Sequence, residues 1–250
     1  MMRALTFNIS AGNCSAYATN LSLQDKYQRV VQLIKQHDPH LISLQELDEM
    51  ASQTIGGGLA ADYTHLGSAE SHCGSTHIWA LHSLQASPMP SAGCVAMAKI
   101  PLPLPEGMSG TAGSAGYFVF AGCHLEPFSD GAPMRLKQLE VALRSMPPRC
   151  RLVLAGDLNM RNAEEPSVEG LGLSDASKWA GSKALFTWNS SINKYHGPEQ
   201  RSYTARYDRV YLRGWSCQQL QLIANEPVTP GHLDYLSDHF GLLATLQLLP

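Results

Sequence analysis

The chain has 250 residues, of which 44% are hydrophobic, and its 18 basic and 21 acidic residues give a net charge of −3. This composition excludes a mainly disordered chain, because enough apolar surface is available to form a core. A membrane-spanning protein is excluded as well, since no stretch approaches the roughly 18 to 20 uninterrupted apolar residues that a spanning helix needs. The low charge also argues against binding of long duplex nucleic acid through a broad basic surface.

Two features of the sequence bear on its cellular compartment. Residues 1–8 run directly into a strand-like pattern, without the apolar stretch and small-residue cleavage site of a secretory signal. The six cysteines lie far apart and include no Cys-x-x-Cys pair, so we expect reduced thiols rather than disulfides or a zinc site. We therefore expect an intracellular protein, nuclear or cytoplasmic, that is not secreted.

Two amphipathic helices are expected among short apolar runs that are typical of buried strands. Residues 24–36 carry apolar side chains at helical spacing, and Ser22 and Asp25 match a capping box at the start of this segment. Residues 133–146 carry a leucine stripe, and Pro147 supplies a stop signal directly after it. Helices that alternate with such strands indicate an α/β or α+β layered sandwich.

The stretch most like a linker is residues 101–116, which are rich in Pro, Gly and Ser. Strand-like segments at 94–100 and 117–123 flank it on both sides, which favours a loop between neighbouring strands over a domain boundary. We therefore expect residues 1–250 to form a single domain.

The most informative feature is where the apolar runs end. Six of them finish in polar or ionisable side chains, in the motifs Thr6-Phe7-Asn8, Leu44-Gln45-Glu46, Cys123-His124-Leu125-Glu126, Gly156-Asp157-Leu158-Asn159, Tyr207-Asp208-Arg209 and Ser237-Asp238-His239. Each motif alone has an ordinary explanation, such as an Asx turn, a helix cap or a surface residue. The coincidence of six favours a preorganised site at one rim of the core. No role is expected for the lone histidines His65, His72, His77 and His196.

In this order, the six motifs resemble the endonuclease/exonuclease/phosphatase superfamily of metal-dependent phosphodiesterases, over essentially the whole chain. Within it, the sequence is most similar to the metal-dependent 5′-tyrosyl-DNA phosphodiesterases, in the segments 124–126, 156–161, 186–189 and 237–242. The resemblance implies a four-layer α/β/β/α sandwich with two packed mixed β-sheets and the site at one edge of the sheets.

The residue types and the resemblance together imply a site for a hard metal ion. Mg²⁺ prefers oxygen ligands and keeps several bound waters, so one or two carboxylates and a substrate phosphate suffice. Glu46 is expected as the principal ligand, with Asn8 and Asp238 beside the metal, partly through water. Mn²⁺ is expected to substitute for Mg²⁺. Neither a cysteine cluster nor a His-x-x-x-His pair is present to bind a softer metal.

The resemblance also implies a set of catalytic roles. Asp157 would orient and deprotonate the attacking water, and Asn159 would hold that water and a phosphate oxygen. His124 and His239 would donate hydrogen bonds to the non-bridging phosphate oxygens. Asp208 would orient His239 through the other ring nitrogen, as carboxylates do beside many functional histidines.

Three further residues are candidates for substrate binding. Arg161 follows Asn159 by two positions, so in an extended segment it can reach a neighbouring phosphate. Trp188 and Tyr207 resemble the aromatic wall on which the family's single-stranded 5′ end rests, although ordinary core packing is the alternative for both. The expected partner is a single-stranded 5′ end of DNA or RNA with a covalent tyrosyl adduct. We expect the protein to be a monomer and not to bind a membrane.

Two departures from the tyrosyl-phosphodiesterase pattern bear on the substrate. Pro127 stands where serine is usual, and Ser129 stands where arginine is expected. Three functions therefore stay open. The favoured one is hydrolysis of a 5′-phosphotyrosyl linkage to leave a 5′-phosphate, hence DNA repair. The second is another superfamily activity, such as an abasic-site endonuclease or a small-molecule phosphatase. The third is a catalytically inactive binding scaffold, which the intact set of polar strand ends disfavours.

Overall fold

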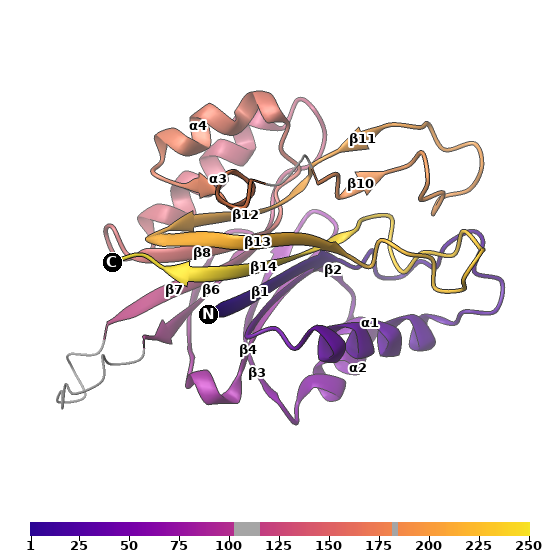
Figure 1. The fold of residues 1–250 in the computed structure, drawn as a ribbon, viewed down its shortest axis with the longest axis horizontal. Helices are drawn as coiled ribbons and strands as arrows, with labels where there is room; N and C mark the ends of the chain where they lie inside the picture. The colour runs from indigo at the N-terminus through magenta and orange to yellow at the C-terminus, as the bar shows by residue number, and fades with distance from the viewer. Residues whose placement is uncertain (103–115, 182–184) are drawn as a thin grey trace.

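Two six-stranded mixed β-sheets form the centre of the computed structural model, which describes residues 1–102, 116–181 and 185–250 (Figure 1). In spatial order, the first sheet contains β13 (Trp215–Ile223), β14 (Gly241–Leu248), β1 (Met2–Asn8), β2 (Leu41–Leu47), β4 (Gly74–Leu81) and β3 (Tyr63–Ser71). The second sheet contains β5 (Ser87–Ala92), β6 (Val95–Pro101), β7 (Tyr117–His124), β8 (Arg151–Asp157), β12 (Asp208–Arg213) and β9 (Ser174–Asp175). Each sheet has one parallel pair near its centre, β1 with β2 and β7 with β8.

Helices cover the outer face of each sheet, so the order of layers is α/β/β/α (Figure 1). Leu5 and Leu44 of the first sheet share a core cluster with residues of α1 (Leu23–His37) and α2 (Glu49–Leu59). Leu154 of the second sheet shares another with Leu139 of α3 (Ala132–Arg144) and Val168 of α4 (Glu165–Gly170). The remaining elements are short: η1 (His82–Leu84), η2 (Asn162–Glu164), α5 (Ala176–Trp179) and the pair β10 (Trp188–Asn189) and β11 (Thr204–Ala205). The expected four-layer sandwich is confirmed.

The inner faces of the two sheets are in close contact near the end that carries the polar motifs. A Cβ on Gly122 would come within 2.4 Å of the Ile78 side chain and 2.5 Å of Ser43 Oγ, so only glycine fits between the sheets there. Ser43 Oγ donates a hydrogen bond across the gap to the Ala155 carbonyl at 3.1 Å. Because interiors this dense resist displacement, the spacing of the sheets is fixed next to the strand ends.

The structure confirms the two expected helices. The first helix begins one residue earlier than predicted, and its capping box between Ser22 and Asp25 is formed. Strands β6 and β7 pair with each other in antiparallel fashion, which agrees with a connecting loop, although residues 103–115 of that loop lie outside the described residues. Helix α2 is not among the helices expected from the sequence, and its three consecutive glycines have low helix propensity. It forms because Asp48 caps its first turn and its apolar side is buried against β2.

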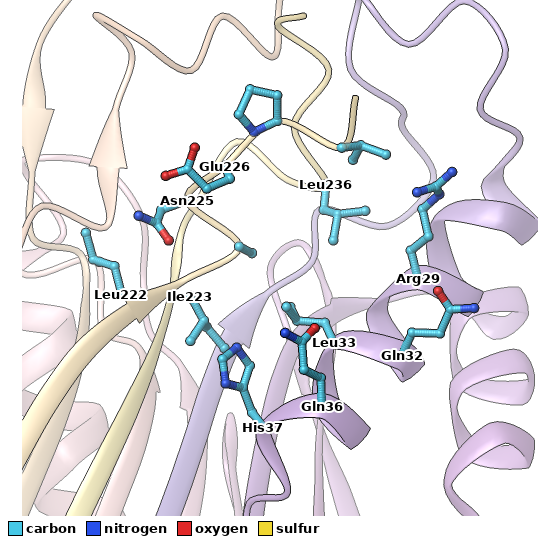
Figure 2. A pocket seen from close by; sticks show the side chains of 13 residues that line it. Arg29, Gln32, Leu33, Gln36, His37, Leu222, Ile223, Asn225, Glu226 and Leu236 are labelled. Atoms are coloured by element: carbon cyan, nitrogen blue, oxygen red, sulfur yellow. The ribbon is translucent and has the colours of Figure 1, made fainter. Parts of the chain in front are cut away.

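A hollow of about 430 Å³ lies between α1 and the segment that follows β13 (Figure 2). Arg29 and His37 of α1 line one side of this hollow, and Glu226 lines the other. None of the residues expected in the functional site lines it. In the part of the chain that the structure describes, no helix is both long and apolar enough to cross a membrane.

Candidate active site

The six polar motifs meet at one edge of the two sheets. Strands β1 and β2 run parallel, so Asn8 and Glu46 lie at the same edge of the first sheet. In the second sheet β7 and β8 also run parallel, and His124 is in register with Asp157. Asp208 is in register with Asp157 on the other side of β8. The convergence expected from the strand ends is therefore present in the structure.

Two of the motifs reach this edge in a different way from the one expected. Asp208 begins β12 rather than ending a strand, and His239 lies just before β14. Each of these strands runs antiparallel to its neighbour, β12 to β8 and β14 to β1. An antiparallel strand begins where its neighbour ends, so both side chains still arrive beside Asp157.

The Asn8 amide connects the carboxylates of the two sheets. Asn8 Nδ2 donates to Glu46 Oε1 at 2.9 Å and to Asp157 Oδ2 at 3.0 Å. Asn8 Oδ1 accepts a hydrogen bond from the backbone N–H of Ser10 at 3.0 Å, which fixes the orientation of the amide. Glu46 itself has a left-handed backbone with φ of 57°, at an irregularity in the pairing of β2 with β4. Strained backbone of this kind is frequent at functional sites.

Two histidines lie close to the same oxygen of the Asp157 carboxylate. His239 Nδ1 is 2.8 Å from Asp208 Oδ2, and its Nε2 is 3.7 Å from Asp157 Oδ2. His124 Nε2 is 3.6 Å from the same Asp157 oxygen. Burial alone would lower the pKa of His239, but the carboxylates of Asp208 and Asp157 raise it well above its usual range. The raised pKa favours the imidazolium form of His239, which can donate from both ring nitrogens.

The Asp157–Asn159 segment forms the Asx turn that the sequence allowed, and it lies in the site as well. The backbone N–H of Asn159 donates to Asp157 Oδ1 at 2.9 Å. Asn159 Nδ2 donates to the Leu125 carbonyl at 3.1 Å, which ties this turn to the segment after His124. The Arg161 guanidinium donates to the Asn159 carbonyl and lies over the Tyr207 ring, 4.8 Å from its centre.

The Asp238 carboxylate points toward His196, a residue for which the sequence suggested no role. Asp238 Oδ2 is 2.8 Å from His196 Nε2, and Asp238 Oδ1 lies 3.2 Å from Ser237 Oγ, whose proton goes to the Asn8 carbonyl at 2.7 Å. Burial alone would raise the pKa of Asp238, but the hydrogen bond from His196 and the nearby His239 lower it. The structure therefore brings Asp238 close to the group around Asn8 without a direct hydrogen bond to Asn8 or Glu46. The contact with His196 has no signal in the sequence, because 42 positions separate the two residues.

Aromatic rings form one side of the site. The Trp188 ring packs edge-on against His239, with the ring centres 5.2 Å apart, and stacks on Tyr203 at 5.7 Å. Tyr207 lies 6.0 Å from Trp188. Trp188 and Tyr207 are thus neighbours beside His239, as the aromatic-wall interpretation requires, and Tyr203 is a member that the sequence did not reveal. Thr187 Oγ1, also not anticipated, accepts from the backbone N–H groups of Tyr207 and Asp208 at 3.1 Å each.

The donor atoms in the site fit a hard divalent cation. One ligand atom each from Glu46, His124 and Asp157 lie within 4.8 Å of one another, and Asp157, Asp208 and His239 form a second such group. Burial raises the pKa of Glu46, and nearby Asp238 adds to this effect, while the hydrogen bond from Asn8 opposes it. Crowded carboxylates of this kind are stabilised by a cation, and carboxylate oxygens are the ligands that Mg²⁺ and Mn²⁺ prefer.

Comparison with known proteins identifies the family. The profile of the Endonuclease/Exonuclease/phosphatase family matches residues 5–239, so the chain belongs to this family. Tyrosyl-DNA phosphodiesterase 2 from Danio rerio is 31% identical over 142 residues, which is 50% of this chain and 36% of that protein. The human protein of the same name is 28% identical over 139 residues, 50% of this chain and 38% of that protein. These matches span little more than a third of the length of the curated relatives.

The fold is similar to that of solved structures over nearly the whole chain. A crystal structure of the Danio rerio tyrosyl-DNA phosphodiesterase 2 with a single-strand DNA product superposes with a TM-score of 0.73, at 22% identity and 98% coverage of both chains. A truncated form of the Caenorhabditis elegans protein gives a TM-score of 0.70 at 19% identity, with 99% of this chain and 97% of the truncated chain covered. The expected membership of the superfamily and the expected sandwich are thus confirmed.

We predict that the site binds a divalent cation through Glu46. A titration of Mn²⁺ followed by electron paramagnetic resonance should show that Glu46→Gln weakens binding about tenfold or more, because a charged oxygen ligand is lost. Glu49→Gln is the matched control, since Glu49 is exposed on α2 and its side chain accepts a hydrogen bond from Gln53. Equal Mn²⁺ affinity in the wild type and Glu46→Gln would contradict the assignment of Glu46 as the principal ligand.

Proposed function

We propose that the protein is a metal-dependent phosphodiesterase that hydrolyses 5′-phosphotyrosyl linkages between protein and DNA or RNA and leaves a 5′-phosphate. The observation that carries this proposal is the environment of Asp157. Asp157 is 1% exposed, its carboxylate accepts hydrogen bonds from Asn8 and Asn159, and the Nε2 atoms of two histidines lie within 3.7 Å of its Oδ2. A basic group flanked by donors is the arrangement that in-line attack of water on a phosphodiester requires.

In the proposed reaction, Asp157 holds and deprotonates the attacking water. A bond forms between the water oxygen and phosphorus, the bond from phosphorus to the tyrosyl oxygen breaks, and the water proton passes to Asp157. Asn159 holds the water and a phosphate oxygen beside Asp157, because its backbone is tied to Asp157 Oδ1 and its side chain to the Leu125 carbonyl. The departing phenolate needs less assistance than a sugar alkoxide, since the pKa of a tyrosine hydroxyl is only about 10.

The two histidines donate to the non-bridging phosphate oxygens, where negative charge develops in the transition state. His239 acts as a cation held in place by Asp208, and the 2.8 Å contact with Asp208 leaves its Nε2 directed to the site. Glu46, with Asn8 and Asp238 nearby, would hold the divalent cation. Such an ion supplies further positive charge beside the phosphate when it is bound.

Mg²⁺ is proposed as the metal and a single-stranded 5′ end as the substrate. The carboxylate and amide oxygens in the site support the assignment of Mg²⁺, and Mn²⁺ is expected to substitute for it. The aromatic surface of Trp188 and Tyr207 supports stacking of bases, and Arg161 beside Asn159 supports a contact with a neighbouring phosphate. In the cell, this reaction would remove protein adducts from nucleic acid ends during DNA repair. The intracellular location and the monomeric state expected from the sequence remain predictions.

A specific feature favours a second candidate, a phosphodiesterase or phosphatase of the same family that acts on another substrate. Pro127 and Ser129 replace the hydroxyl donor and the arginine that tyrosyl phosphodiesterases usually place after the His-Leu-Glu motif. The segment therefore offers fewer charged contacts to a nucleic acid backbone. An abasic-site endonuclease or a small-molecule phosphatase is the alternative on this ground.

One assay separates these functions. The protein is incubated with Mg²⁺ and a 5′-tyrosyl oligonucleotide, in parallel with an abasic duplex and a simple phosphodiester. We expect fastest release of tyrosine from the first substrate, and loss of the activity when EDTA removes the metal. Preferential cleavage of the abasic duplex or of the simple ester would favour the second candidate, and undiminished turnover in excess EDTA would falsify metal dependence.

A second prediction separates the roles of the carboxylates. Asp157→Asn and His239→Ala should each lower kcat far more than they raise KM, because their contacts strengthen as charge develops in the transition state. Asp208→Asn should cause a smaller loss, since Asp208 acts only through His239. Steady-state kinetics on the tyrosyl oligonucleotide provide the measurement. A larger effect of Asp208→Asn than of Asp157→Asn would show that Asp157 is not the residue that activates water.

A third prediction concerns the aromatic wall. Trp188→Ala should weaken binding of a single-stranded 5′ end by about 1 to 3 kcal/mol, the usual contribution of stacking between a base and an aromatic ring. Hydrolysis of a small chromogenic phosphodiester, which has no bases to stack, should change little. Trp179→Ala is a suitable control, because Trp179 is exposed and its indole N–H bonds to Ser174, away from His239. If Trp188→Ala impaired the reactions of both substrates equally, the role of Trp188 would be to support His239 and not to stack against bases.

A further inference from the structure

The hairpin of β3 and β4 reaches the candidate active site from the first sheet, and its tip at residues 71–74 fits closely against the end of β2. At Gly74, where φ is +93°, an added Cβ would come within 3.0 Å of the Leu47 carbonyl oxygen and 3.3 Å of the Glu46 carbonyl carbon. Ser75 Oγ donates to that same Leu47 carbonyl at 3.0 Å. The tip is therefore held firmly beside Glu46, and so is Ser71 at its start.

Ser71 makes a contact with His124 that crosses from the first sheet to the second. Ser71 Oγ lies 3.1 Å from His124 Nδ1 and 2.8 Å from the Gly74 carbonyl oxygen. A carbonyl oxygen can only accept a hydrogen bond, so the single hydroxyl proton of Ser71 goes to Gly74. Ser71 Oγ must then accept from His124, which requires a proton on Nδ1.

We infer that Ser71 is a positioning residue for His124. Its hydroxyl fixes the proton on Nδ1 and the orientation of the ring, so that Nε2 points into the site between Glu46 Oε1 at 3.8 Å and Asp157 Oδ2 at 3.6 Å. This inference rests on the proposed function, in which His124 acts as an imidazolium, with its Nδ1–H donated to Ser71 and its Nε2–H facing a substrate phosphate oxygen. Ser71 thus does for His124 what Asp208 does for His239, with a neutral hydroxyl in place of a carboxylate.

The kinetic test is a double-mutant cycle on the 5′-tyrosyl oligonucleotide. Ser71→Ala should lower kcat about tenfold with little change in KM, as loss of an orienting partner does. Ser71→Thr keeps the hydroxyl and should restore most of the activity. In a His124→Ala background, Ser71→Ala should cause no additional loss, because the residue through which it acts is absent. Ser91→Ala is the matched control, since this exposed hydroxyl donates to the Ser68 carbonyl, away from His124.

A second measurement tests the same inference without catalysis. In the metal-free protein with ¹⁵N-labelled histidine, the Nδ1 shift of His124 should be that of a protonated nitrogen, and Ser71→Ala should move it. Unchanged kcat in Ser71→Ala, an added loss in the His124→Ala background, or an unprotonated Nδ1 in the wild type would each overturn the inference. Absence of cleavage by the wild type would instead overturn the proposed function, and the ¹⁵N shifts would still decide whether Ser71 fixes the ring.

Discussion

The geometry of the site depends on one side-chain amide that connects the two sheets. Asn8 Nδ2 has two hydrogens, and it uses them on Glu46 of the first sheet and Asp157 of the second, at 2.9 and 3.0 Å. Both bonds can form only if the sheets keep a fixed separation at this edge. The glycine contact at position 122 and the bond from Ser43 to the Ala155 carbonyl set that separation a few residues away. Core packing thus determines the distance between the proposed metal ligand and the proposed base.

A second constraint is the accumulation of buried acidic groups. Asp157, Asp208 and Asp238 converge with Glu46, and burial of so many carboxylates is unfavourable unless each has a cationic or hydrogen-bonding partner. The chain supplies His239 between Asp208 and Asp157, and His196 against Asp238. Glu46 lies outside these pairs: its pKa is raised, and Asn8 donates a hydrogen bond to it. A divalent cation would therefore stabilise the ionised form of Glu46 more than that of the other three carboxylates.

The sequence reveals those parts of the structure that have local signals. The capping box at Ser22 predicts the start of α1, and the polar residue at each strand end predicts the convergence at one edge, because strands of a packed sheet share their ends. The direction of β12 and β14 is not encoded locally, so the sequence predicts Asp208 and His239 at the ends of strands, whereas Asp208 begins β12 and His239 lies just before β14. The contacts of His196 with Asp238 and of Ser71 with His124 join residues 42 and 53 positions apart. Only the tertiary fold brings such partners together.

The two sides of the site differ in chemistry, and the difference bears on what it can recognise. On one side, the Arg161 guanidinium is already engaged with the Asn159 carbonyl and the Tyr207 ring, so it presents an oriented planar donor rather than a free charge. Beside it, Trp188 is supported by Tyr203 and in turn packs against His239. In the segment that follows His124, Pro127 has no N–H to offer to a phosphate, and the ring of Phe128 after it is exposed. The proposed single-stranded substrate therefore depends on stacking against Trp188 and Tyr207 more than on contacts with its phosphate backbone, because backbone recognition needs several free cations.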